Sequence, residues 1–116
     1  MFNQAERVVD VIEIQRLYAL DSAPGVLDLV RATPSLAAVL ADAHRALREF
    51  FPDETLTLEL DLDPETRDGD ARLVLWIASR GEVQDALARL DRFDREWWID
   101  RLANADDRLS ISLAFE

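Results

Sequence analysis

Residues 56–63 read LTLELDLD, an alternation of leucine with polar residues that decides the fold of the second half of the chain. Alternation with a period of two places the leucines on one face of a strand and the polar residues on the other. Residues 72–78 repeat the pattern as RLVLWIA, and the turn region 64–70 between them contains Asp68-Gly69, a pair typical of tight turns. We therefore predict a hairpin with a leucine face toward the core and an acidic face toward water.

The segment after this hairpin changes period. Ser79 and Glu82 have the spacing of a capping box, which predicts the start of a helix. Apolar residues on one side of that helix are Val83, Ala86, Leu87, Leu90, Phe93 and Trp97. We expect the helix to reach about Ala103, with a break at Asp94, and residues 109–115 then alternate again as a terminal strand.

The first half of the chain is predicted to be helical. Thr33-Pro34 is a helix-start signal, and the apolar spacing that follows indicates an amphipathic helix over 34–51. Val26–Ala32 fits a shorter helix. The segment Ala5–Leu20 is apolar on more than one side, which suggests a helix covered on several sides, with a second subunit as one possible cover. A strand over Val8–Ile14 is the alternative, because β-branched residues dominate it.

These elements predict an α+β fold in which N-terminal helices precede a β-β-α-β unit. We expect a small, mainly antiparallel three-stranded sheet, covered on one face by helices. The chain has no internal repeat or linker, so residues 1–116 are interpreted as one domain with a helical part (1–51) and a β-β-α-β part (53–116).

The composition points to a cytoplasmic protein. Hydrophobic residues make up 49% of the chain, which is enough for a core, but no apolar run approaches the roughly 18 residues that cross a bilayer. The first residues lack the pattern of a signal peptide, and there is no cysteine for a disulfide or a thiolate metal site.

The charge is strongly negative. Asp and Glu number 24 against 13 bases, all of them arginine, for a net charge of −11. Such a charge repels nucleic acids and anionic membranes, so we expect neither as a direct partner. It suits a basic protein partner, and it is equally compatible with acidity that only keeps the protein in solution.

Most of the excess acid lies in the hairpin. Residues 53–70 hold eight carboxylates and one base, Arg67. The carboxylates predicted to contact a basic partner are Asp61, Asp63, Glu65, Asp68 and Asp70. Calcium or magnesium is the competing interpretation, but Thr66 stands where a calcium-binding loop requires glycine and no glutamate closes the loop, so no metal or cofactor is expected.

An aromatic string, FDREWW at residues 93–98, is the second candidate partner-binding region. Trp97 and Trp98 lie on different sides of a helix and cannot easily enter one small core together. One interpretation places one tryptophan in the core and the other at its rim. The other makes them an anchor for a partner, flanked by Arg95 and Arg101 and extended by Trp76 on the polar face of the second strand.

No residue pattern predicts catalysis. The single histidine, His44, lies in mid-helix and no serine stands in a Gly-x-Ser-x-Gly turn. A phosphate-binding loop is excluded because the chain has no lysine and its glycines are far apart. We therefore expect no catalytic residue and a protein that is not an enzyme.

Three motifs together give a resemblance. These are the FFP triplet at 50–52 before the acidic strand, the DPE triplet at 63–65 and FDxxWW at 93–98. Over residues 34–116 the chain resembles a group of small, uncharacterised acidic bacterial and archaeal proteins that look like antitoxins. The resemblance implies a stoichiometric inhibitor of a basic partner, and the alternative is a homo-oligomeric module, for instance a homodimer joined through its sheet edges.

Overall fold

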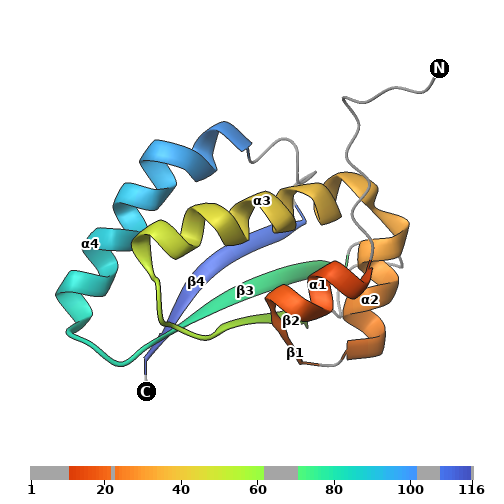
Figure 1. Ribbon diagram of the computed structural model, residues 1–116, viewed down its shortest axis with the longest axis horizontal. Coiled ribbons are helices and arrows are strands. Elements are labelled where there is room, and N and C mark those ends of the chain that lie inside the picture. The colour runs from red at the N-terminus through yellow and green to blue at the C-terminus, as the bar shows by residue number, and fades with distance from the viewer. Residues whose placement is uncertain (1–10, 22, 62–70, 102–107, 116) are drawn as a thin grey trace.

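The computed structural model describes residues 11–21, 23–61, 71–101 and 108–115 (Figure 1). Helices and strands are interspersed along this part of the chain. The elements are α1 (Val11–Leu17), β1 (Ala19–Asp21), α2 (Ala23–Ala32), α3 (Pro34–Phe50), β2 (Leu56–Asp61), β3 (Arg72–Ser79), α4 (Val83–Phe93), the π-helical turn η1 (Asp94–Trp98) and β4 (Leu109–Phe115).

The described strands form one mixed sheet in the order β1-β2-β3-β4. β2 and β3 are antiparallel, as the hairpin prediction requires, but β1 pairs parallel to β2 and β4 parallel to β3. The mixture of helices and strands is confirmed, whereas the prediction of a three-stranded, mainly antiparallel sheet is wrong. The parallel pairs arise because helices connect these strands, and a helical crossover returns the chain to the end of the sheet where it started.

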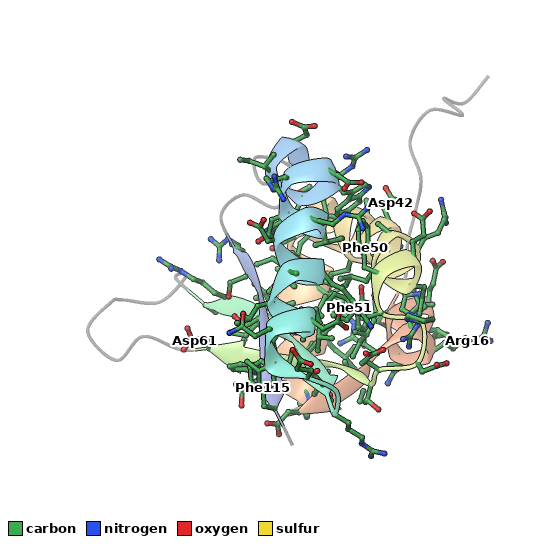
Figure 2. The ribbon with its side chains drawn as sticks, turned by 90° about the vertical axis from the view of Figure 1, so that its left-hand side faces the viewer. Arg16, Asp42, Phe50, Phe51, Asp61 and Phe115 are labelled. Atoms are coloured by element: carbon green, nitrogen blue, oxygen red, sulfur yellow. The ribbon has the colours of Figure 1, made fainter. Side chains whose placement is uncertain are left out.

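The leucine face of the hairpin forms the floor of the core. The register places Leu56, Leu58 and Leu60 of β2 opposite Ile77, Leu75 and Leu73 of β3. The helices lie on this side of the sheet, and the polar side carries no described helix (Figure 2). This arrangement leaves one face of the sheet open, as the acidic alternation in β2 predicted.

Helix α3 begins and ends close to its predicted limits. Its start uses the backbone of Thr33, whose carbonyl accepts hydrogen bonds from the amides of Leu36 and Ala37, and the Thr33 side chain makes no capping bond. The predicted capping box before α4 is wrong. Ser79 is buried inside β3, and α4 follows Glu82, which makes no side-chain cap.

The N-terminal prediction also needs correction. Within the described residues, the predicted helix over Ala5–Leu20 is helical only as α1, and Ala19–Asp21 are a strand at the sheet edge. The alternative strand over Val8–Ile14 is wrong where it is described, because Val11–Ile14 belong to α1. A strand of three residues is too short for alternation to reveal it in the sequence.

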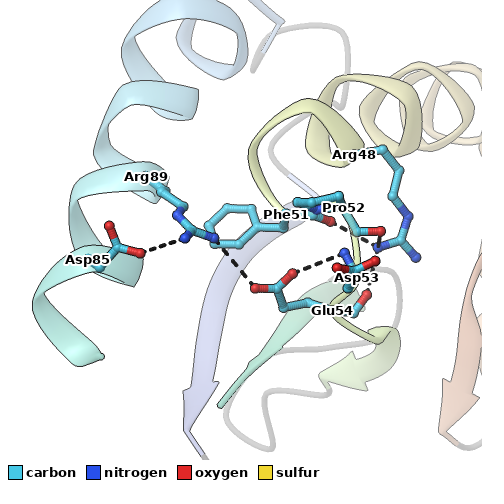
Figure 3. A network of polar contacts seen from close by, with 7 residues as sticks. All are labelled: Arg48, Phe51, Pro52, Asp53, Glu54, Asp85 and Arg89. Atoms are coloured by element: carbon cyan, nitrogen blue, oxygen red, sulfur yellow. Dashed lines mark hydrogen bonds and ion pairs between the residues drawn. The ribbon is translucent and has the colours of Figure 1, made fainter. Parts of the chain in front are cut away.

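Two local features determine how the helices lie against the strands. A β-carbon on Gly25 of α2 would lie 2.6 Å from Cδ2 of Leu60, so glycine allows α2 to approach β2 closely. After α3, Nη1 of Arg48 donates to the carbonyl oxygens of Phe51 (3.0 Å), Pro52 (3.3 Å) and Glu54 (2.7 Å), as Figure 3 shows. One guanidinium thus holds the turn that directs the chain from α3 into β2.

Candidate functional site

The open face of the sheet gathers short side chains around one tryptophan. Its positions follow from the strand register, since side chains at every second residue point to the same face. They are Ala19 and Asp21 of β1, Thr57, Glu59 and Asp61 of β2, Arg72, Val74, Trp76 and Ala78 of β3, and Ser110, Ser112 and Ala114 of β4.

Trp76 stands at the centre of this open face. Its cross-strand neighbours are Thr57 on β2 and Ser112 on β4, and both are too small to cover an indole. The ring is half-buried, and its Nε1 donates a hydrogen bond of 3.0 Å to Oε1 of Glu59. The structure therefore holds an indole on an open surface with a carboxylate fixed at its polar edge.

Carboxylates outnumber basic groups on the open face. Its described residues hold three acids, Asp21, Glu59 and Asp61, and one base, Arg72. Asp21 lies opposite Glu59 in the parallel β1–β2 pair, an arrangement of like charges that costs stability. Asp61 lies opposite Arg72 in the β2–β3 register, and within the described part of the chain neither Asp21 nor Asp61 forms an ion pair. The described residues of this face therefore keep an excess of negative charge.

The structure places only some of the predicted hairpin acids. Asp61 is exposed at the end of β2, on the same face as Trp76. The other four, Asp63, Glu65, Asp68 and Asp70, lie outside the described residues. Asp21 and Glu59 were not predicted as site residues. Glu59 had a signal in the alternation of β2, whereas Asp21 had none, because it lies just after the predicted helix Ala5–Leu20 and the strand β1 was not predicted.

The FDREWW string forms an aromatic stack within the helical layer. Phe93 stacks on Trp97 with ring centroids 5.5 Å apart, and Trp97 stacks on Trp98 at 6.2 Å. Phe50 of α3 closes the other end by an edge contact of 5.8 Å with Phe93. Trp98 is buried and Trp97 half-buried, so the structure has one tryptophan in the core and one at its rim.

The change of helix type makes this stack possible. α4 ends at Phe93, next to the predicted break at Asp94, and η1 follows with the amide of Ile99 donating to the carbonyl of Asp94. A π-helical turn holds more residues than an α-helical turn and so rotates the side chains after it. Trp97 and Trp98 both lie in this turn, and their ring planes are 12° apart.

The arginines beside the stack are already engaged. Arg101 donates to the carbonyl of Trp97 at 3.1 Å, and its guanidinium carbon lies 4.4 Å from the centroid of the Trp97 ring. Arg95 pairs with Asp91 at 2.8 Å. Arg101 thus stabilises the rim of the stack, and Arg95, although paired with Asp91, stays exposed. The role of these residues in binding a partner stays a prediction.

The two predicted tryptophan surfaces do not join. Trp76 projects from the open face, whereas Trp97 and Trp98 belong to η1 in the helical layer and pack against the core on the opposite side of the sheet. The sheet itself separates them. Trp76 with Asp61 and Trp97 with Arg101 are therefore two distinct surfaces.

A hollow of about 510 Å³ lies where α3, β2, β3 and α4 meet, lined in part by Glu54, Arg80 and Arg89. Arg89 bridges Asp85 (2.6 Å) and Glu54 (3.7 Å), and a Glu54 carboxylate oxygen accepts the amide of Asp53 at 3.2 Å (Figure 3). Arg89 is shared between the two acids here, an arrangement typical of a structural junction.

The one histidine has a structural environment. Its ring packs edge-on against Tyr18 at 5.5 Å, and the Tyr18 hydroxyl donates to the buried carbonyl of Leu40 at 2.6 Å. Burial, with a smaller effect of Arg48, lowers the pKa of His44, and burial raises the pKa of Tyr18. Both groups therefore stay neutral near pH 7 and serve to pack α1 against α3.

In the part of the chain that the structure describes, no three His, Cys, Asp or Glu side chains are grouped to hold a metal ion. None of the described helices is long and apolar enough to span a bilayer.

Comparisons with known proteins return no relative. The chain matches no protein-family model, no curated protein and no solved structure.

Proposed function

We propose that this protein is a non-enzymatic binding module whose open sheet face receives a basic segment of a partner protein. The observation that carries the proposal is the half-buried Trp76 indole, which has Glu59 fixed at its edge and two further carboxylates, Asp21 and Asp61, on the same face. A guanidinium or ammonium group favours the face of a tryptophan, and nearby carboxylates strengthen its binding.

The charge pattern selects the class of partner. Phosphate-rich nucleic acids and anionic membranes are repelled by the net charge of −11, whereas a basic protein is attracted over several ångströms and oriented on approach. The acids at 63, 65, 68 and 70 follow Asp61 directly in the sequence and add to that attraction. An antitoxin-like inhibitor that neutralises a basic cytoplasmic effector is the specific form of this proposal.

The unfavourable placement of Asp21 opposite Glu59 supports a binding role. Like charges on neighbouring strands destabilise the folded chain, and an arginine or a lysine at position 21 would remove that cost. Residues that reduce stability without a local compensation tend to occur where function requires them. A bound basic group would offset the repulsion between Asp21 and Glu59.

The test compares two double charge reversals. Asp21→Arg with Asp61→Arg changes the open face, and Asp28→Arg with Asp100→Arg makes the same charge change at exposed sites in the helical layer. Each tagged protein is used to capture partners from its native lysate after nuclease treatment, over a range of salt concentrations. We expect the wild type and the helical-layer variant to recover the same basic protein, released by high salt, and the open-face variant to lose it.

The association rates of the variants with the captured protein then measure how much the acids of the open face contribute to binding. At low salt, the open-face variant should associate at least about tenfold more slowly, because steering by opposite charges accelerates encounter. Equal rates for the two double variants, or capture of no basic protein by the wild type, would contradict the proposal.

A further inference from the structure

We infer that the free edge of β4 is a homodimer interface at which two copies of this chain join their sheets in an antiparallel pair. This inference is independent of the proposed function. β4 occupies the end of the sheet order, and within the described residues it pairs only with β3. The strand has seven residues, Leu109–Phe115, and contains neither a charge nor a proline, the features that usually protect a free edge from pairing.

The sequence of β4 is complementary to itself. When two copies run antiparallel with Ser112 on the two-fold axis, Ile111 meets Leu113 of the second copy and Leu109 meets Phe115. On the other face, Ser110 meets Ala114. Every apolar residue then faces an apolar residue on the core side, and every small residue faces a small one on the open side.

The backbone hydrogen-bonding groups of β4 alternate in direction as this register requires. The carbonyl of Arg108 accepts from the amide of Leu73, so in β4 the even-numbered residues direct their polar backbone groups toward β3. The odd-numbered residues, from Leu109 to Phe115, therefore direct theirs to the free edge. In the register centred on Ser112 these are the residues that pair, which allows about eight hydrogen bonds across the axis.

Helix α4 adds an apolar flank to this edge. Arg89 reaches Glu54 and Arg92 lies over Phe50, so that side of α4 faces α3. Val83 and Leu87 lie on the opposite side of the helix and are 47% and 48% exposed. Because α4 packs against β4, this side borders the free edge, where Phe115 is 47% exposed as well. Two copies would bring their α4 helices together through these residues.

Charge and size favour a second copy as the occupant. A chain of net charge −11 can approach itself only through an uncharged surface, and β4 provides one. A strand of seven residues is about 23 Å long, and with the helical layer behind it the contact is roughly 20 Å deep. The two protomers would bury about 900 Å² together, less than most stable interfaces, which predicts a reversible dimer of micromolar or weaker affinity.

The opposite edge of the sheet limits the assembly to two chains. β1 has only three residues and carries Asp21, so it offers no comparable partner for β4. Pairing of β4 with β4 uses the same edge on both copies and closes the assembly. It also places Trp76 of each copy level with Ser112 on the axis, so two Trp76 rings would lie about 14 Å apart on one continuous open face.

The first experiment is sedimentation velocity of the full chain from low micromolar to near-millimolar concentration. We expect the mass to rise from that of the 13.2 kDa chain to twice that value. Leu87→Glu should raise the dissociation constant at least about tenfold, because it places two acids between the α4 helices. Ala88→Glu, the same charge change on the solvent side of α4, should leave it unchanged. A chain that stays monomeric at every concentration would overturn the inference.

The second experiment tests the register and uses the absence of natural cysteines. The Ser112→Cys protein should form a disulfide-linked dimer under mild oxidation, because the two copies of residue 112 face each other on the axis. The matched Ser110→Cys protein should not, since residue 110 faces Ala114 of the other copy. Equal cross-linking of both variants, or of neither, would overturn the proposed pairing.

Discussion

Trp76 and Trp97 are both half-buried, yet their surroundings differ in one respect. Trp97 lies in a stack of rings, and Arg101 supplies both a hydrogen bond to its carbonyl and a cation over its ring. Trp76 has one carboxylate, Glu59, at its polar edge and no described cation over its ring. The first site is complete within the chain, and the second lacks the positive charge that its chemistry would favour.

The comparison gives a criterion that distinguishes a structural from a functional aromatic residue in a small domain. A tryptophan whose polar and electrostatic needs are met inside the chain contributes mainly to stability. A tryptophan on an acidic surface contributes little to the stability of the fold. A basic ligand that binds there offsets the charge of that surface. A substitution in the aromatic stack should therefore lower stability more than partner binding. A substitution at Trp76 should lower partner binding more than stability.

The largest expected effect is at the stack. Trp98→Ala should lower the free energy of unfolding by about 3–5 kcal/mol, because it leaves a cavity beside Trp97 in the core. Trp97→Ala should cost less, since that ring is partly exposed already. Denaturant titration of both variants gives the measurement. If Trp98→Ala costs no more than Trp76→Ala, the assignment of the stack to the core is wrong.

Trp76→Ala should show the reverse pattern. We expect a loss of only about 1 kcal/mol in stability, because the side chain packs on one side only. Affinity for the captured partner should fall by about thirtyfold, the equivalent of a 2 kcal/mol hot spot. Trp76→Phe serves as the control that keeps a ring but removes the hydrogen bond to Glu59. Unchanged partner affinity in Trp76→Ala would remove this residue from the interface.

Asp21→Lys should move stability and binding in opposite directions. Replacing the carboxylate opposite Glu59 by a cation should stabilise the fold by about 0.5 kcal/mol, since it converts a like-charge pair into an attractive one. The same change should weaken partner binding. Asp28→Lys, an exposed site in α2, is the control and should leave binding unchanged. A fall in stability with Asp21→Lys would show that Asp21 and Glu59 do not destabilise the folded chain by repulsion.

The smallest effect is expected at Asp94, at the junction of α4 and η1. Burial, with the nearby charge of Asp91, raises the pKa of Asp94. The folded chain therefore binds this proton more tightly than the unfolded chain, and the stability from Asp94 falls as pH rises from the ordinary value of 3.8 through the raised one. Thermal melts should show Asp94→Asn slightly more stable than wild type at pH 7, with the gain vanishing below pH 3.8. A gain that grows toward low pH would contradict the sign.

Much of the fold was predictable where the pattern was long. The leucine alternation of β2 and β3 specified their pairing and their buried face, and the 3.6-residue periodicity after Pro34 specified α3. Prediction failed at β1, because three residues cannot show a period, and at Ser79, whose capping spacing competes with burial in β3. Of the candidate site, Trp76 and Asp61 were predictable from alternation, whereas Asp21 depended on the missed strand.

The sequence by itself determined the helix and strand types of the regular segments, the leucine face of the hairpin and the excess of negative charge. These properties are local, because periodicity and composition act over a few residues at a time. Only the tertiary structure decided the strand order, the insertion of β1 beside β2, the π-helical turn that stacks Trp97 on Trp98, and the separation of Trp76 from them. Those features depend on which distant segments bury their apolar surfaces together, and no local pattern records that choice.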